Sequence, residues 1–363
     1  MKKTLLTIVL AIALSMTVVA IFAGCDLFSG GNGDNGALVA NYDHFYIEDN
    51  EVVGLTELGL QQTILVVPAS ITSINRNATA TTPSPFRHLV VEHMFTVKFE
   101  ANSNLEIIGT NAFFGVHHLE SITIPSSVTT IRLRAFNSAR GLRTVNFESN
   151  SKLETIGESA FFDTPLLQSI TIPASVRSIG TSAFAESMAN PSQLHTVNFE
   201  ENSQLTNIGS SAFRSSALEN IALPSSVTMI GSGAFAGTAL TSISIPPLVT
   251  SIAATLFANS SLVSITIPST VIHIGAGAFR GATSLTSINI PFSVTEIGWE
   301  AFCGTTSLTS ITIPASVAAM GVRVFQGWTA EQTIHIQGRT ETELPSGFHS
   351  WLYGSSANIV WNA

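Results

Sequence analysis

Apolar residues recur along most of this chain in one repeating pattern. Within 308–327, leucine and isoleucine alternate with serine and threonine, and a proline, two more aliphatic residues and a phenylalanine follow. The phenylalanine marks the repeat most clearly, because it returns every 22 to 29 residues at Phe113, Phe136, Phe161, Phe184, Phe213, Phe235, Phe257, Phe279, Phe302 and Phe325. A fixed period in this range is typical of a solenoid.

Each repeat predicts two short strands and a turn. In the segment 119–136, Leu119, Ile122 and Ile124 have the alternation of a strand with one buried face. Pro125 ends that strand, because proline cannot donate a hydrogen bond to a neighbouring strand. A second aliphatic pair predicts another short strand, and a tight or helical turn then carries the phenylalanine.

Such a unit has to be stacked on its neighbours to be stable. Each coil buries about six apolar side chains at roughly 1.5–3 kcal/mol each, whereas ordering about 23 residues costs roughly 1–2 kcal/mol apiece. Neighbouring coils reverse this balance by sharing hydrogen bonds and covering the open faces. A recurring glycine after the second strand indicates a positive φ angle or close approach between coils, at Gly109, Gly157, Gly180, Gly209, Gly231, Gly275, Gly298 and Gly321.

A second version of the repeat has Phe-Glu in place of Ile-Pro. It occurs at Phe99-Glu100, Phe147-Glu148 and Phe199-Glu200, and an Asn-Ser pair follows each time. This version alternates with the proline version through the first half of the chain and then disappears. The first half is therefore predicted to repeat every two coils.

These repeats resemble the leucine-rich repeats of the BspA-like class, a family of bacterial surface proteins. The resemblance covers about Phe86–Phe325 and rests on phenylalanines in register. It implies a mostly β solenoid of about ten to eleven coils of 22–25 residues, with short strands, tight or helical turns and terminal caps. It also implies roles in adhesion to host matrix proteins, host cells or other bacteria, and it supplies no shared catalytic site.

The pattern divides the chain into five predicted segments: a lipoprotein signal peptide (1–24), a lipidated cysteine with a flexible tether (25–36), an N-terminal cap (37–85), the solenoid (86–327) and a C-terminal cap (328–363). The last segment gathers Trp328, Trp351, Tyr353 and Trp361. A terminal coil must cover the open core, so these aromatic residues favour a cap over a ligand site.

The first residues have the composition of an export signal. Lys2 and Lys3 precede an uncharged, mostly apolar run, and Phe22-Ala23-Gly24 lead directly to Cys25. Small residues before a cysteine resemble the lipobox of bacterial lipoproteins, which implies cleavage before Cys25 and lipidation of that residue. An uncleaved transmembrane anchor is the alternative, because the run is about 20 residues long. In both cases a glycine-rich tether precedes the folded part.

Composition narrows the classes of partner. The formal net charge is −9 and charged residues make up 11% of the chain, with no basic stripe, so nucleic-acid binding is not expected. The two cysteines, Cys25 and Cys303, lie far apart in the sequence and offer no disulfide framework or metal-ligand spacing. No cofactor is predicted.

Two sets of residues are candidates for binding. Outward positions of the first strands form a ladder of hydroxyls and amides, with Ser121, Thr123, Ser169, Thr171, Ser242, Ser244, Ser264, Thr266, Ser287, Asn289, Ser310 and Thr312 as the principal members. The longest interval in the repeat marks an insertion, and its candidates are Glu186, Met188 and Asn190. In both sets, a merely solvent-compatible strand face or a tolerated loop is the simpler alternative.

The sequence therefore predicts a lipid-anchored, surface-exposed repeat protein that mediates protein–protein interaction or adhesion. Its partners would be proteins on a host or bacterial surface, with the membrane held through the N-terminal lipid. One alternative is a structural envelope or spacer protein without a dedicated ligand, and a less favoured one is a glycan-binding module or hydrolase. No nucleotide loop or serine–histidine–acid set stands out, so enzymatic activity is not expected.

Overall fold

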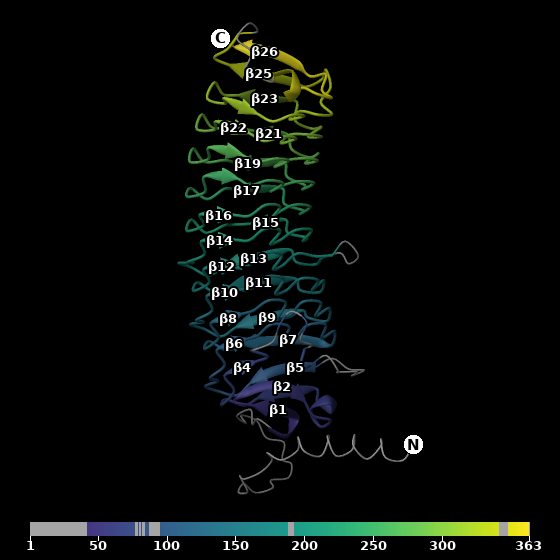
Figure 1. Ribbon diagram of the computed structural model, residues 1–363, viewed down its shortest axis with the longest axis vertical. Coiled ribbons are helices and arrows are strands. Elements are labelled where there is room, and N and C mark those ends of the chain that lie inside the picture. The colour runs from purple at the N-terminus through teal and green to yellow at the C-terminus, as the bar shows by residue number, and fades with distance from the viewer. Residues whose placement is uncertain are drawn as a thin grey trace, which may run out of the picture. The chain divides into compact units, whose positions relative to one another are not determined.

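The computed structural model describes residues 42–76, 79, 81, 84–86, 95–187, 192–340 and 348–362. These residues belong to one compact unit, Leu38–Ala363, and they form about twelve stacked coils (Figure 1). The segment Met1–Ala37 is a separate unit. The predicted lipidation site Cys25 lies in it, outside the described residues.

The first strand of each coil pairs in parallel with its neighbours. These strands form four sheets, β3-β5-β7-β9, β11-β13-β15, β17-β19-β21 and β23-β25-β26, and we call them together the first strand line. Their bounds are β3 (Ile64–Val67), β5 (Phe95–Phe99), β7 (Leu119–Ile124), β9 (Thr144–Phe147), β11 (Ser169–Ile172), β13 (Thr196–Phe199), β15 (Asn220–Ile221), β17 (Ser242–Ser244), β19 (Ser264–Thr266), β21 (Ser287–Ile288), β23 (Ser310–Ile313), β25 (Thr333–Gln337) and β26 (Asn358–Asn362).

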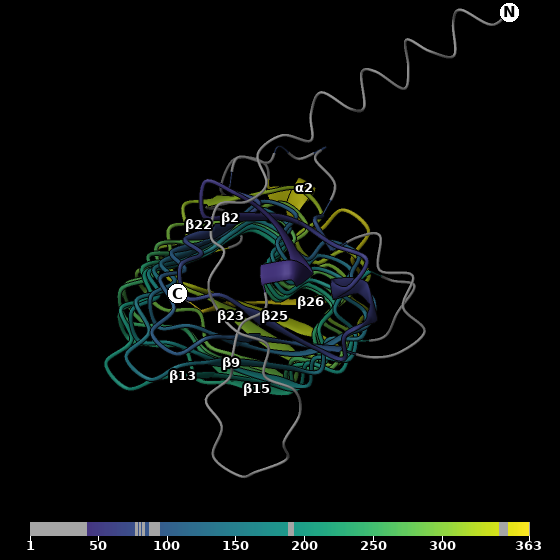
Figure 2. The same ribbon diagram turned by 90° about the horizontal axis from the view of Figure 1, so that it is seen from below.

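The second strands form another line on a different side of the cross-section (Figure 2). A nine-stranded sheet begins with β1 (Phe45–Glu48) antiparallel to β2 (Glu51–Leu55), and a four-stranded sheet continues it. The remaining members are β4 (Ser73–Ile74), β6 (Ile107–Ile108), β8 (Thr130–Ile131), β10 (Thr155–Ile156), β12 (Ser178–Ile179), β14 (Asn207–Ile208), β16 (Met229–Ile230), β18 (Ser251–Ile252), β20 (His273–Ile274), β22 (Glu296–Ile297) and β24 (Ala319–Met320).

Helices are scarce among the described residues. They are limited to the 3-10 turns η1 (Tyr42–His44) and η2 (Gly59–Gln61) and the short α2 (Phe348–Trp351). The prediction of a mostly β solenoid with short strands is confirmed.

The phenylalanine turns are tight but not helical, and they make the third side of each coil. Their rings stack from Phe86 to Phe325 with centroids 4.6 to 6.0 Å apart, and the ring of Trp328 closes the series edge-on. Backbone hydrogen bonds run alongside, as from the Phe136 N–H to the Ala160 carbonyl at 2.7 Å. Because each ring from Phe113 to Phe325 is buried between two others, removing one leaves a cavity rather than an exposed gap.

The recurring glycines lie where coils touch. A Cβ added at Gly231 would lie 2.4 Å from the Ser210 nitrogen, and one at Gly275 would lie 2.6 Å from the Ala254 nitrogen. The φ angles of these two glycines are not positive. Close backbone approach between coils, rather than a special φ angle, therefore explains why the repeat uses glycine here.

The Phe-Glu coils are cross-linked to the proline coils that precede them. A carboxylate oxygen of each glutamate accepts a 2.9 Å hydrogen bond from the backbone N–H just after the proline of the preceding coil, in the pairs Glu100–Ala69, Glu148–Ser126 and Glu200–Ala174. The asparagines that follow have positive φ angles, as at Asn150 with φ 59°, a conformation that asparagine tolerates. Each glutamate thus joins its coil to the preceding proline coil, which explains the two-coil period.

Both strand lines extend into the segments predicted as caps. β4 pairs with β6, and β25 and β26 continue the first strand line to Asn362. Trp328 and Trp351 are both buried and belong to the hydrophobic core. The aromatic tail therefore packs on the last coils.

One level of the stack lacks pairing in both strand lines. The described residues show no pairing between β15 and β17 or between β16 and β18, and we call this level the seam. The core and the phenylalanine stack continue across it, since Phe235 and Phe257 are 5.9 Å apart and the Phe235 N–H bonds to the Leu256 carbonyl. The seam is thus closed on the turn side and interrupted on the two strand sides.

Two replacements in the coil that follows the seam account for it. Ala253 stands where its neighbours have glycine, and Leu248 stands where they have serine or threonine. In neighbouring coils that hydroxyl bonds to the carbonyl of the preceding coil, as from Thr270 to Val249 at 2.9 Å. Arg132 also carries a Cβ at the glycine position, yet β6 and β8 pair, and Ser127 keeps its hydroxyl bond there. Losing both features together therefore separates the coils.

Candidate functional site

The predicted polar ladder lies where the sequence analysis placed it. Its residues alternate with buried aliphatic residues along the first strand line, so that in β11 Ser169 and Thr171 are exposed while Ile170 and Ile172 are buried. Two outward ranks result, and the remaining positions that the sequence pattern assigns to them are Thr144, Asn146, Thr196, Asn198, Asn220 and Ala222. The ladder is an accessible surface of hydroxyls and amides.

The residues around the predicted insertion are arranged differently from the expectation. Met188 and Asn190 lie outside the described residues, and Glu186 is buried, with a carboxylate oxygen that has no hydrogen-bond partner in the described part of the chain. Burial, and next the nearby Asp163 carboxylate, raises the pKa of Glu186 from 4.5 to about 8. Asp163 is held by Arg140 at 2.8 Å and by the Ser187 hydroxyl at 2.9 Å. Glu186 is therefore a buried residue beside Asp163, not an exposed contact residue.

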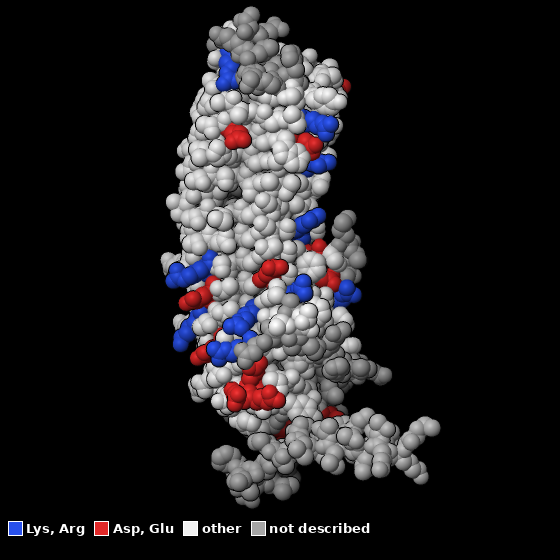
Figure 3. Space-filling view, viewed as in Figure 1, with Lys and Arg blue, Asp and Glu red and all other residues white. Residues whose placement is uncertain are grey.

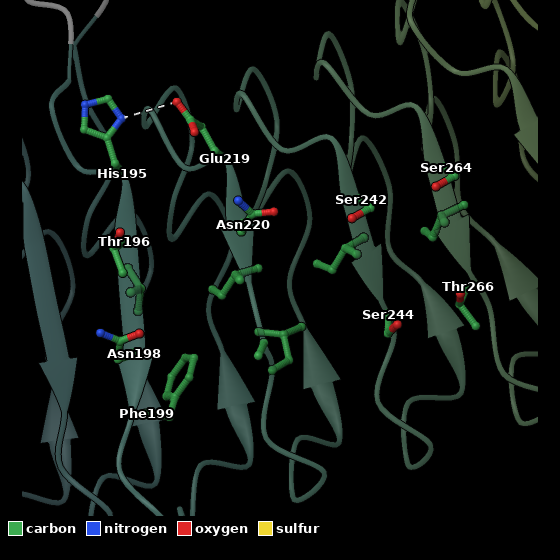
Figure 4. Close-up of a pocket in the computed structure, with 16 residues that line it drawn as sticks. His195, Thr196, Asn198, Phe199, Glu219, Asn220, Ser242, Ser244, Ser264 and Thr266 are labelled. Atoms are coloured by element: carbon green, nitrogen blue, oxygen red, sulfur yellow. Dashed lines mark ion pairs between the residues drawn. The ribbon is translucent and has the colours of Figure 1, made fainter.

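A hollow opens in the polar ladder at the seam. It has a volume of about 850 Å³ and spans the strands β13, β15, β17 and β19. Figure 4 shows the hydroxyls and amides of these strands along it, with His195 and Glu219 at one rim, 3.9 Å apart. Ala222, which lines the hollow, interrupts the rank that elsewhere carries asparagine, serine or threonine. The sequence analysis did not single out this place, although Ala222 was a visible departure from the rank.

Charge is distributed unevenly along the stack. Between residues 220 and 295, Arg280 is the one residue among Asp, Glu, Lys and Arg. Charged side chains gather over the N-terminal coils in Figure 3, and a nearly uncharged band lies above them. The hollow therefore borders the uncharged coils, with Glu219 at its charged edge.

An aromatic patch near the C-terminal coils also escaped the sequence analysis. Trp299 and Val322 occupy equivalent positions in successive coils and are about half exposed, and Tyr353 is more exposed still. The Arg323 guanidinium lies 5.2 Å from the centre of the Tyr353 ring. The signal was the tryptophan at a place that the four preceding coils fill with serine or alanine. Trp, Tyr and Arg are the residue types enriched at binding hot spots.

Chemistry-bearing groups are dispersed over the described coils. No group of three or more His, Cys, Asp or Glu that could hold a metal ion is found among the described residues. Cys303 is a free, half-buried thiol, and burial followed by the nearby Glu300 carboxylate raises its pKa. A raised pKa leaves less thiolate, the reactive form. Among these residues, no helix is long and apolar enough to cross a bilayer.

Solved structures with a similar fold come from several bacteria. A leucine-rich repeat protein from Bacteroides ovatus ATCC 8483 is 20% identical with a TM-score of 0.51, over 93% of this chain and 99% of that chain. The pneumococcal vaccine antigen PcpA is 24% identical with a TM-score of 0.48, over 83% and 82%. A leucine rich cell surface protein from Faecalibacterium prausnitzii A2-165 is 20% identical with a TM-score of 0.39, over 93% and 96%. At these identities the likeness is one of fold alone.

No curated protein matches the chain. One family of sequences does match, over residues 92–190 and 206–332, and its description is a BspA type leucine rich repeat region. The match covers more than half of the chain and includes all ten phenylalanine repeats predicted above. The chain belongs to the BspA-type leucine-rich-repeat family.

Proposed function

We propose that this protein is exported, anchored through a lipid on Cys25, and displayed on the bacterial surface, where its polar ladder makes adhesive contacts with proteins. The observation that carries the proposal is the ladder itself. It presents two exposed ranks of uncharged polar side chains over most of the first strand line. Such a surface offers many hydrogen-bonding groups at a regular spacing without fixing a single deep pocket.

The affinity of such a surface comes from many weak contacts rather than from a few strong anchor residues. The ladder lacks the tryptophan, tyrosine and arginine anchors that dominate tight interfaces. Many modest contacts along one partner, or many copies of the protein on one cell, raise the effective affinity by multivalency. An elongated repeat on a lipid anchor suits that mode of binding.

The anchor is tested by metabolic labelling of the full-length chain with a fatty-acid analogue. We expect label in the wild type and in Cys303→Ser, the matched control because Cys303 is the other cysteine of the chain. Label should be absent in Cys25→Ser. Equal labelling of both variants would rule out Cys25 as the lipidated residue.

Adhesion is tested with the full-length chain against immobilised collagens and matrix glycoproteins. We expect saturable binding that weakens at least tenfold in Thr123→Glu/Thr171→Glu, because both substitutions put charge on the exposed ladder. Ser251→Glu/Ala319→Glu puts the same charge on exposed positions of the second strand line and should leave binding unchanged. If the folded wild type captures none of these proteins, the spacer alternative becomes the better account.

A further inference from the structure

The seam creates a place that the regular ladder does not have. Strand pairing is absent between β15 and β17, and one hydrogen bond of 3.3 Å, from the Thr241 N–H to the Glu219 carbonyl, joins the two coils just before these strands begin. β15 is two residues long, whereas β13 beside it has four. We propose that the hollow at this point is a binding site for a neutral oligosaccharide.

The polar groups of the hollow suit a ligand made of hydroxyls. Asn198 and Asn220 each offer two donors and an acceptor, and the hydroxyls of Thr196, Ser242 and Ser244 both donate and accept. A sugar hydroxyl needs partners of both kinds. These five side chains stand on three neighbouring strands and all line the hollow (Figure 4).

Apolar side chains line the hollow beside the polar ones, and Phe199, Ile221 and Leu223 are among them. Phe199 and Leu223 are half-buried, so that each keeps part of its surface open to the hollow. The face of an aromatic ring carries negative charge density and attracts the polarised C–H groups on the flat side of a sugar. A ring beside amides and hydroxyls therefore satisfies both aspects of a carbohydrate.

The charge pattern selects for a neutral ligand. Of the residues that line the hollow, Glu219 is the one carboxylate, and it stands at the rim beside His195. No lysine or arginine lines the hollow to hold a sulfate or uronate group. The ladder has a second, smaller hollow of about 220 Å³ between β9 and β11. It differs from the hollow at the seam because Arg143 and Glu200 line it and because the second strand line is continuous at its level.

The size of the hollow fits an oligosaccharide rather than a single sugar. Its volume of about 850 Å³ lies in the upper part of the range of ligand pockets, roughly 300–1,000 Å³. The wall mixes hydroxyl and amide groups with apolar side chains such as Ile221 and Leu223, and this mixture suits the polar edges and apolar faces of sugar rings. This site is separate from the adhesive use of the ladder as a whole, so either can fail without the other.

The experiment uses the full-length chain in a detergent without a sugar headgroup. The probes are neutral tetra- to hexasaccharides of glucose, galactose, mannose and N-acetylglucosamine, with a sulfated oligosaccharide for comparison. Saturation-transfer NMR detects binding, and calorimetry measures the affinity. We expect at least one neutral probe to bind and the sulfated probe to bind at least tenfold more weakly.

The decisive variant fills the hollow. Ala222 is exposed, so Ala222→Tyr should fold normally and reduce the affinity for the bound probe at least tenfold. Thr312→Tyr, in the same rank on the C-terminal coils, is the matched control and should bind like wild type. Failure of every neutral probe to bind, or equal binding by Ala222→Tyr and wild type, would overturn the proposal, as would a preference for the sulfated probe.

Discussion

The coils on both sides of the seam share hydroxyl-to-carbonyl bonds, as at Ser127 and Ser293, but among the described residues only those on the N-terminal side add glutamate cross-links. On the N-terminal side, carboxylates such as that of Glu148 accept hydrogen bonds from the backbone of the preceding coil. On the C-terminal side every coil up to β24 has the Pro form, and hydroxyls such as that of Ser293 bridge to the preceding carbonyl, here Val271 at 2.6 Å. The first half is a cross-linked stack of alternating coils, and the second is a stack of nearly identical ones.

This difference shows what the uniform coils depend on. Where glutamate cross-links are absent, coil contact rests on backbone pairing, one hydroxyl and a glycine at the point of closest approach. The seam coil has Leu248 and Ala253 at those last two positions, and both strand lines are interrupted there. The stack survives because burial of the phenylalanine turns, which is the larger stabilising contribution, continues through the seam.

The comparison predicts that a second seam can be made on the C-terminal side. In Gly275→Ala, the new Cβ would lie 2.6 Å from the Ala254 nitrogen, so β18 and β20 must move apart. We expect a loss of about 1–3 kcal/mol in the free energy of unfolding, measured by urea denaturation of the full-length chain. Arg132→Gly, which removes a Cβ at the same position of an N-terminal coil, is the control and should lose less. Unchanged stability of Gly275→Ala would mean that close approach is not what the glycine provides.

The buried carboxyl of Glu186, on the N-terminal side of the seam, predicts that the stability of the fold depends on pH. Because the pKa of Glu186 rises from 4.5 to about 8 on folding, the folded state binds more protons than the unfolded state between these values. Stability is therefore fully present below about pH 4.5 and falls as pH rises through 8. Glu186→Gln should be more stable than wild type by about 1–2 kcal/mol at pH 9 and equal to it at pH 4. Parallel stability profiles from pH 4 to 9 would contradict the burial of this carboxyl.

The regular part of the fold was accessible from the sequence because the repeat sets both period and burial. Ile170 and Thr171 occupy the inward and outward positions that alternation predicts. The strand lines extend beyond Phe86–Phe325, because β4 and β26 pair without the phenylalanine mark. Glu186 looked like an exposed loop residue, and linear spacing does not reveal that the stacked coils bury it beside Asp163 of the preceding coil.

The hollow could not be predicted from the sequence for the same reason. Ala222, Leu248 and Ala253 are each modest departures from the repeat when taken alone. The three positions come together only in the folded stack. There Ala222 lies on one side of the seam, and Leu248 and Ala253 lie in the coil on the other side, which causes the interruption. Sequence reasoning listed the rank but could not see that its gap coincides with lost strand pairing.

Weakening one glutamate cross-link should lower the free energy of unfolding by less than Gly275→Ala does. Glu148→Gln keeps the shape of the side chain but removes the charge from its hydrogen bond to the Ser126 N–H. We expect a loss of about 0.5–1 kcal/mol in the free energy of unfolding, because the bond is exposed and weakened by solvent. Glu201→Gln, at an exposed turn residue nearby, should change stability less. A larger loss in Glu201→Gln than in Glu148→Gln would remove the distinction drawn between the two halves.

The smallest change in stability should come from closing the seam. Leu248→Ser/Ala253→Gly restores the hydroxyl and the glycine of neighbouring coils, so β16 and β18 should pair as β18 and β20 do. Restored pairing protects backbone amides from exchange, whereas the gain in the free energy of unfolding stays below about 1 kcal/mol because the core already spans the seam. Hydrogen exchange should slow at least tenfold at Thr250 and residue 253, while Ile272 and Gly275, which already bond to the preceding coil, should not change. Fast exchange at Thr250 and residue 253 in the double variant would show that the interruption has another cause, and slow exchange at all four positions in the wild type would show that the two halves are one continuous stack.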